Sequence, residues 1–352
     1  MSVTYHKYTK SNIRAWLESG TPNGLSELVI SKTRAYALIY NPYVTDESVL
    51  VVSAMDGDQL VGFVAAFPDY LARPECRCVV GTTLYVLPEY TGDFIGLELV
   101  KTIKECYSEH LLIGSDETKS AALIDKLLGN KIDTFPRSRF EMNRTIHVHS
   151  LRSLGSAILE PFRRLRMRVN IRRSIASVTP NIRLEYLSMI DNEAYRFIVA
   201  HSPHDAFLRS QQSLNWTLRY PFSVTAPLQQ HLNTQNQFGA QISESMNMAV
   251  KVYDTDQLIG VYVLAKRRAD AKMLMLYVDD AHAEQVYATI VAHIHLWQPH
   301  HFFSQYAGLN AYMNQHHLSL HHYIDKYFYT HPASLPCTPA QQLQGADGDM
   351  FA

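Results

Sequence analysis

Residues 82–103, TTLYVLPEYTGDFIGLELVKTI, decide how the first part of this chain folds. Residues 82–87 are β-branched, aromatic and aliphatic, which predicts a buried strand. Pro88 ends that strand because proline has no N–H to donate to a neighbour. Gly92 and Gly96 bracket a polar loop, and the apolar residues that follow recur at the spacing of one helix face. A helix that begins in such a loop presents free backbone N–H groups, so the sequence predicts an anion site suited to a pyrophosphate.

The same stretch resembles the acetyl-CoA-binding motif of the GCN5-related N-acetyltransferase (GNAT) superfamily. The residues that fall on the motif are Val86, Pro88, Tyr90, Gly92, Ile95 and Gly96. Two positions depart from it: Thr91 stands where arginine or glutamine is usual, and Phe94 stands where the middle glycine is usual. The resemblance covers residues 1–145, whose expected order of helices, hairpin, strand, loop and helix is also the order of the family.

The resemblance implies that an acyl-CoA, with acetyl-CoA as the expected form, is the co-substrate. It assigns the binding of CoA to Leu84, Tyr85, Val86, Thr91, Gly92, Asp93, Phe94, Ile95 and Gly96. Phe94 adds a side chain where the backbone would approach a phosphate, and Asp93 adds a negative charge. The loop is therefore expected to be a degenerate version of the family's motif.

Acyl transfer to an amine also needs a base that keeps the amine neutral. The candidate catalytic residues are Glu75, Glu89, Asp116, Glu117 and Tyr85. A carboxylate in such a position is more often an ordinary surface charge than a catalytic base. Family members often carry a tyrosine that meets the leaving thiolate in the helix expected over 118–128, but Ile124 stands near that position here. The sequence leaves the identity of the acid and the base open.

The second half of the chain repeats the first. Residues 56–62, DGDQLVG, recur as DTDQLIG at 254–260, and LYV at 84–86 recurs at 276–278. YALIY at 36–40 is echoed by WTLRY at 216–220. After Val278 the sequence has no glycine loop, and Asp279, Asp280 and Glu284 would repel a pyrophosphate. We therefore expect a tandem GNAT-like chain whose second copy does not bind CoA.

The repeat predicts an α/β (α+β) fold of two GNAT-like domains, each a mixed, mostly antiparallel sheet flanked by helices. The expected segments are an acyl-CoA-binding domain over 1–150, a basic amphipathic linker helix over 151–180, a degenerate domain over 181–332 and a disordered tail over 333–352.

In the linker, an apolar stripe predicts a face that packs on both domains; it comprises Leu151, Leu154, Ile158, Phe162, Leu165 and Val169. The accompanying arginines predict a solvated basic face or, alternatively, a surface for substrate phosphates or acidic lipid headgroups, and so peripheral membrane contact through 151–176.

Composition limits the other classes of function. A net charge of −1 gives no general attraction to nucleic acid. The start of the sequence shows no apolar signal segment, and no run of about 18 apolar residues occurs, so we predict no transmembrane helix and a cytoplasmic location. The four cysteines, and the histidines that crowd residues 293–331, lack the spacing of a metal site, so none is predicted. The oligomeric state stays open.

These features favour an acyl-CoA-dependent N-acyltransferase, specifically N-acetylation of a small amine or amino sugar by direct transfer from the thioester. A non-catalytic acyl-CoA-binding or regulatory protein is the alternative that the degenerate loop suggests. A Fem-like aminoacyl transferase is a further alternative, and it would need the arginine-rich linker to bind transfer RNA.

Overall fold

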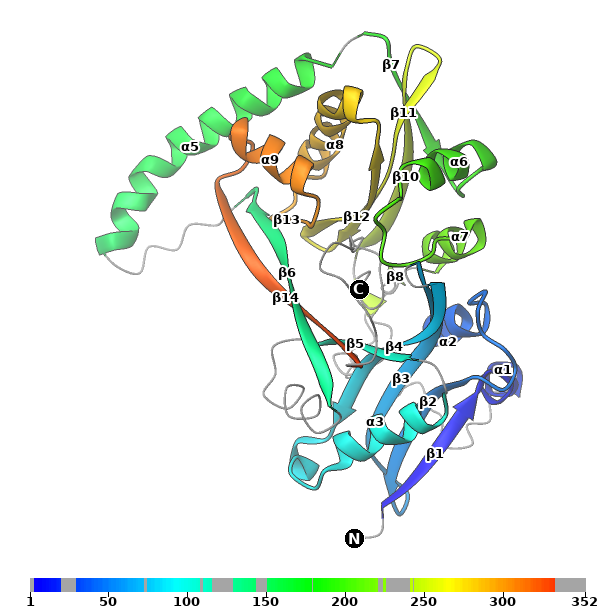
Figure 1. The fold of residues 1–352 in the computed structure, drawn as a ribbon. Helices are drawn as coiled ribbons and strands as arrows, with labels where there is room; N and C mark the ends of the chain where they lie inside the picture. The colour runs from blue at the N-terminus through cyan, green and yellow to red at the C-terminus, as the bar shows by residue number, and fades with distance from the viewer. Residues whose placement is uncertain are drawn as a thin grey trace. The chain divides into compact units, whose positions relative to one another are not determined.

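The computed structural model describes residues 3–19, 30–72, 75–107, 110–115, 129–143, 151–178, 180–220, 224–225, 241–242 and 244–332. The chain divides into two compact units, drawn in Figure 1. Unit 1 comprises residues 1–135, 204–243 and 327–352, and unit 2 comprises residues 136–203 and 244–326. Each unit contains segments from both halves of the sequence, whereas the repeat predicts contiguous domains; the boundaries at 150 and 181 stay a prediction. The expected tail over 333–352 lies outside the described residues.

Unit 1 is built on an antiparallel meander that ends in a parallel pair. Its strands are β1 (Val3–Thr9), β2 (Val49–Asp56), β3 (Gln59–Ala72), β4 (Glu75–Val86) and β5 (His110–Ser115). Its helices are α1 (Lys10–Ser19), α2 (Lys32–Ile39), the 3₁₀ helix η1 (Pro88–Tyr90), α3 (Ile95–Glu105) and α7 (Gln211–Arg219). β1 to β4 pair antiparallel in sequence order and β4 pairs in parallel with β5. The end of β14 (His321–Pro332) then pairs antiparallel with β5 through residues 328–330. β8 (Val224–Thr225) and β9 (Gln241–Ile242) form a separate parallel pair.

α3 covers one face of this sheet through a buried apolar row, namely Ile95, Leu99, Val100 and Ile103. Gly62 of β3 makes this close packing possible. A Cβ at that position would lie 2.8 Å from the backbone oxygen of Tyr85 and 3.2 Å from the Leu99 side chain. The glycine of the repeated DGDQLVG segment is therefore a packing residue.

α7, which belongs to the second half of the sequence, completes the core of unit 1. The indole N–H of Trp216 donates to the carbonyl oxygen of Ala37 at 2.7 Å, and its ring lies 5.8 Å from that of Phe67. Tyr40 and Tyr220, the last residues of the two echoed aromatic segments, stack with their ring centroids 5.8 Å apart. Equivalent segments of the two copies thus pack against each other.

Unit 2 repeats the plan of unit 1. Its strands are the second part of β6 (Asn130–Glu141), from residue 136 on, and β7 (Ile182–Leu187), β10 (Ser245–Asp254), β11 (Gln257–Arg267), β12 (Asp270–Val278) and β13 (His301–Ser304). Its helices are α5 (Leu151–Ala176), α6 (Asn192–Ala200), η3 (Asp280–His282), α8 (Ala283–Trp297) and α9 (Ala307–Gln315). β7, β10, β11 and β12 form the antiparallel meander, β12 pairs in parallel with β13, and residues 138–141 of β6 pair antiparallel with β13. The predicted fold class is confirmed.

α5 falls on the predicted linker helix but turns an unexpected face to the protein. Met167 and Ile171 are buried and join the apolar core of unit 2. Phe162 and Leu165, which belong to the predicted packing stripe, are 69% and 62% exposed. The prediction that the stripe packs is therefore wrong for these residues, because a second set of residues at helical spacing faces the core instead. None of the described helices has the length and apolar character needed to cross a membrane.

Candidate functional site

The end of β4 presents backbone donors away from its neighbour β3. The ladder between them shifts register between Thr82 and Leu84, which marks a bulge in β4. The described parallel pairing with β5 covers residues 78–81, so the end of β4 extends beyond it. The N–H of Leu87 donates to the carbonyl oxygen of Val61 at 2.9 Å, so it points toward β3. Because N–H groups alternate in an antiparallel ladder, those of Leu84 and Val86 point to the other side.

The loop after β4 brings the chain into α3 without a side-chain cap. Gly92 has a φ of 135° and Phe94, the N-cap residue of α3, has a left-handed φ of 58°. The first helical hydrogen bond runs from the N–H of Glu98 to the carbonyl of Phe94 at 3.0 Å. The N–H groups at 95–97 precede it, and the side chain of Phe94 makes no capping bond to them. This is the arrangement that binds anions at a helix start.

Tyr90 anchors the loop to the β2–β3 turn. Its hydroxyl donates to Asp56 Oδ2 at 3.1 Å. Partial burial and this hydrogen bond raise the pKa of Tyr90, so the hydroxyl stays protonated at neutral pH. Thr91, at the position where arginine or glutamine is usual, turns its hydroxyl to the carbonyl of Leu87 at 3.4 Å. Both side chains therefore shape the loop.

Acidic side chains lie near the backbone N–H groups at the start of α3. Glu89 and Asp93 are exposed carboxylates beside the start of α3. Glu98 in the first turn is paired with Lys101 at 2.7 Å. Phe94 is 62% exposed, so its ring stands on the surface of the loop instead of packing under the helix.

The structure separates the predicted catalytic residues. Tyr85 lies at the end of β4, with its ring 5.9 Å from that of Phe63, and Glu89 lies in η1 just beyond. Glu75 begins β4, ten residues before Tyr85, which places it about 30 Å away along the strand. Asp116 and Glu117 lie outside the described residues. Tyr85 and Glu89 are thus the described candidates that share the end of β4 with the loop.

The corresponding region of unit 2 is closed. β12 also shifts register against β11, between Met273 and Met275. Two of its last three residues are buried: Leu276 is 6% exposed, where its counterpart Leu84 is 40% exposed, and Tyr277 is 2% exposed. Asp279 follows, and its carboxylate accepts a hydrogen bond from the N–H of Ala281 at 3.0 Å. The Asp279 side chain thus caps η3, the short helix that leads into α8.

Sequence reasoning placed the glycine loop but missed the bulge and the packing role of Gly62. The available signal was the glycine that ends both copies of the repeated segment. Gly260, the counterpart of Gly62, stands in the same relation to its helix, because a Cβ there would lie 2.7 Å from Val286.

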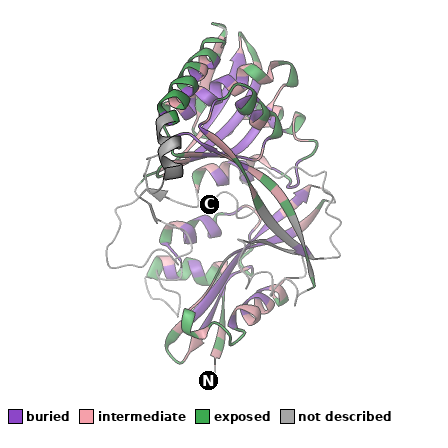
Figure 2. Cartoon of the chain, turned by 90° about the vertical axis from the view of Figure 1, so that its left-hand side faces the viewer, coloured by how far each residue is buried: buried purple, intermediate pink, exposed green. Residues whose placement is uncertain are grey.

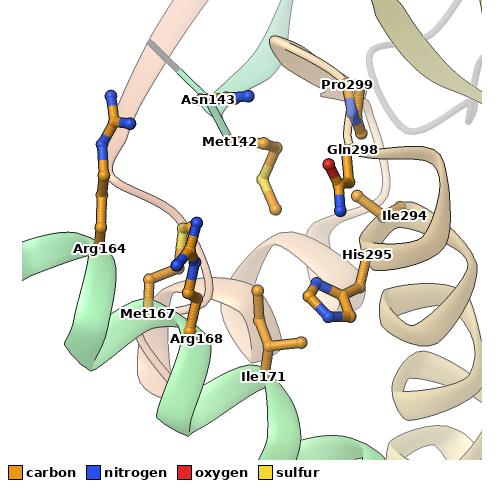
Figure 3. A pocket seen from close by; sticks show the side chains of 10 residues that line it. All are labelled: Met142, Asn143, Arg164, Met167, Arg168, Ile171, Ile294, His295, Gln298 and Pro299. Carbon is orange, nitrogen blue, oxygen red and sulfur yellow. The ribbon is translucent and has the colours of Figure 1, made fainter.

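Unit 2 also contains a hollow of about 80 Å³, shown in Figure 3. It is lined by Met142, Asn143, Arg164, Met167, Arg168, Ile171, Ile294, His295, Gln298 and Pro299. Sites for drug-sized ligands occupy about 300–1,000 Å³, so this hollow is too small for a CoA molecule. Among the residues that the structure describes, no group of three or more histidines, cysteines or carboxylates could hold a metal ion.

Known structures share the fold of this chain over nearly its whole length. The tandem GNAT protein from the clavulanic acid biosynthesis pathway matches 96% of this chain and 100% of its own length, with a TM-score of 0.53 at 12% identity. This chain adopts the tandem GNAT fold. A GCN5-related N-acetyltransferase from Kribbella flavida matches 93% of this chain and 70% of its own, with a TM-score of 0.51 at 12% identity.

The chain is also similar to the structure of Saccharomyces cerevisiae N-myristoyltransferase with bound myristoyl-CoA. It covers 98% of this chain and 82% of its own length, with a TM-score of 0.50 at 9% identity. No protein-family model and no curated protein sequence matches the chain.

Proposed function

We propose that this chain is an acyl-CoA-dependent N-acyltransferase and that its co-substrate, acetyl-CoA, binds at the end of β4 and the start of α3. The observation that carries the proposal is the open strand end of unit 1, where Leu84 is 40% exposed, set against the covered Leu276 of unit 2. The uncapped first turn of α3 supports it, because its N–H groups suit a pyrophosphate.

The backbone supplies the donors that the reaction needs. We assign the N–H groups of Leu84 and Val86 to the thioester carbonyl, where they would stabilise the negative charge that develops on its oxygen. A neutral amine attacks that carbonyl carbon, so that a C–N bond forms and the C–S bond breaks. The amine proton passes to the leaving thiolate, with Tyr85 or Glu89 as the group that carries it.

The acceptor class that we propose is a small amine, with amino sugars included. Its support is the shared fold and the position of the open strand end beside Tyr85, and no described side chain selects one amine. A panel of amines therefore has to identify the acceptor.

The test of the binding site compares two matched substitutions. In Gly96→Asp the new carboxylate would meet the pyrophosphate, and we expect acetyl-CoA binding to be abolished in calorimetry. The control is Ala283→Asp, the matching first-turn position of α8, which should leave the affinity unchanged. Normal binding by Gly96→Asp would place the CoA site elsewhere.

The test of turnover is thiol release from acetyl-CoA against the amine panel. We expect release with at least one small amine, and a reduced kcat with little change in KM for Tyr85→Phe. A regulatory acyl-CoA-binding protein is the second candidate, favoured by the exposed Phe94 and by Asp93 in the loop. Binding without release against every amine would support this second candidate and contradict the first.

A further inference from the structure

The inner face of α5 packs against unit 2. Met167 and Ile171 are 8% and 1% exposed, and the hydroxyl of Ser174 lies 2.6 Å from that of Tyr312. Glu160 is 3% exposed and accepts a hydrogen bond from Arg164 at 3.2 Å. Figure 3 shows this side of the helix facing α8. α5 is therefore held on the surface of unit 2 in a fixed rotation about its axis.

The outer face of α5 carries the apolar stripe. Phe162, Leu165 and Val169 are 69%, 62% and 37% exposed, and Leu159 beside them is 51% exposed. Their spacing of three and four residues aligns them on one side of the helix. Figure 2 shows exposed residues along the outer side of α5. Exposed apolar residues scattered singly need no explanation, whereas a contiguous exposed apolar patch with a polar rim is typical of a protein or membrane interaction site.

Positive charge borders this stripe. At 100° per residue, Arg166 and Arg173 lie along one edge and Arg172 along the other, and all are exposed. Residues 159–176 contain six arginines and one glutamate, a net charge of +5. Because the whole chain has a net charge of −1, the remaining residues carry −6. The basic character of the molecule is therefore concentrated around the stripe.

This charge decides between the surfaces that could cover the stripe. A second copy of the chain docked through the same face would bring two segments of +5 together, which is unfavourable. An acidic bilayer satisfies both features at once. Its headgroup boundary accepts aromatic and aliphatic side chains, and its phosphates attract arginines whose stems lie along the apolar surface.

We propose that α5 is a membrane-docking helix that binds the surface of bilayers containing anionic lipid. Phe162, Leu165 and Val169 enter the boundary between headgroups and acyl chains. The bordering arginines contact lipid phosphates. The helix lies in the plane of the surface, because its inner face is bound to unit 2.

The experiment measures sedimentation of the full chain with phosphatidylcholine vesicles and with the same vesicles containing phosphatidylglycerol. We expect binding to the second kind only, weakened by added salt. The double variant Phe162→Ser/Leu165→Ser should lose at least about tenfold in vesicle affinity. Leu296→Ser is the matched control, because Leu296 is 75% exposed on α8, and it should bind like the wild type.

The arginines are tested separately. Arg166→Gln/Arg173→Gln should lose about fivefold per arginine at low salt. Arg196→Gln, an exposed arginine of α6, should lose nothing. Equal binding to both kinds of vesicle, or wild-type binding by the serine variant, would overturn the proposal. So would a wild-type dimer that the serine variant converts to a monomer, since a second copy would then cover the stripe.

Discussion

At the end of β4 the chain turns through Gly92 and Phe94 before α3 begins, whereas at the end of β12 it passes from Asp279 through η3 directly into α8. The elements before and after are the same in both units. Each has a bulged strand, a parallel neighbour, and a helix that packs on a glycine of the adjacent strand.

This difference shows that the glycine turn before α3 is not needed to build the fold. Leu99 on Gly62 and Val286 on Gly260 fix the helix on the sheet in both units. Neither contact involves the residues of the turn. The core of unit 2 therefore forms without glycines in this turn, which is why the second copy keeps the sequence landmarks of the first.

The sharpest way to break the comparison is to separate the copies. A fragment of residues 1–150 lacks α7 and the strand that pairs with β5. It leaves Ala37 and Phe67 without Trp216. We expect an insoluble product, or one without a cooperative thermal transition by circular dichroism. Co-expression with residues 151–352 should restore a soluble complex. A soluble, cooperatively folded fragment would show that unit 1 is complete in one half of the chain.

The next largest effect concerns the two packing glycines. Gly62→Ala and Gly260→Ala should each lower the free energy of unfolding by about 1–3 kcal/mol, measured by chemical denaturation. Adding Val286→Ala should recover part of the loss at Gly260, because the atoms met there belong to a side chain. Adding Leu99→Ala should recover little at Gly62, because the nearest atom is the backbone oxygen of Tyr85. Equal recovery in both double-mutant cycles would contradict this distinction.

Much of the fold could be predicted because it is local. The strands, the helices and the repeat follow from period and from short identical segments. The sequence could not predict which face of α5 packs against the protein. Two sets of residues recur at helical spacing, namely 162/165/169 and 167/171/174, and spacing alone does not distinguish between them. The glycine loop of the site was predictable for the same local reason. The exposure of the strand end could not be predicted from the sequence. The segment LYV is identical in both copies, yet Leu84 is exposed and Leu276 is buried.

A moderate effect is expected where the two meanders differ in charge. Lys251 of β10 is 3% exposed, with its Nζ 2.8 Å from Asp191, 2.9 Å from Glu185 and 3.0 Å from Glu193. The register places Ser53 at its counterpart in β2. Lys251→Met should cost about 2 kcal/mol of unfolding free energy, since it leaves three partly exposed carboxylates together. Ser53→Ala should cost under about 1 kcal/mol.

The stability deficit of Lys251→Met should depend on pH in a definite direction. Burial alone would raise the pKa of Asp191, but hydrogen bonds from Lys251 and from the N–H of Ala194 bring it below its ordinary value. A depressed carboxyl pKa adds stability above the unfolded pKa, and that stability is lost as the pH falls through the folded value. The deficit of Lys251→Met should therefore shrink below about pH 4. A deficit that grows on acidification would contradict the pairing.

The smallest effect refines the comparison at the turn. Phe94→Gly should tighten acetyl-CoA binding by about 1 kcal/mol, roughly fivefold, if the freed backbone gains one hydrogen bond to phosphate. Gln298→Gly is the control, because Gln298 has a comparable left-handed φ of 47° at the end of α8. Calorimetry should show no change in CoA affinity for it. Weaker binding by Phe94→Gly would mean that the phenyl ring itself contacts the ligand.

The order of translation delays the completion of the sheet of unit 1. β5 is finished at residue 115, but the segment that pairs with it, 328–330, is translated more than 200 residues later. At about 5–20 residues per second, a ribosome needs on the order of 10–40 s for that distance. During this interval the nascent chain carries an unpaired strand edge, the feature that invites aggregation. Unit 1 begins first during translation and is therefore completed last. Whether it avoids aggregation during synthesis depends on how the unpaired edge of β5 is covered until residues 328–330 are made.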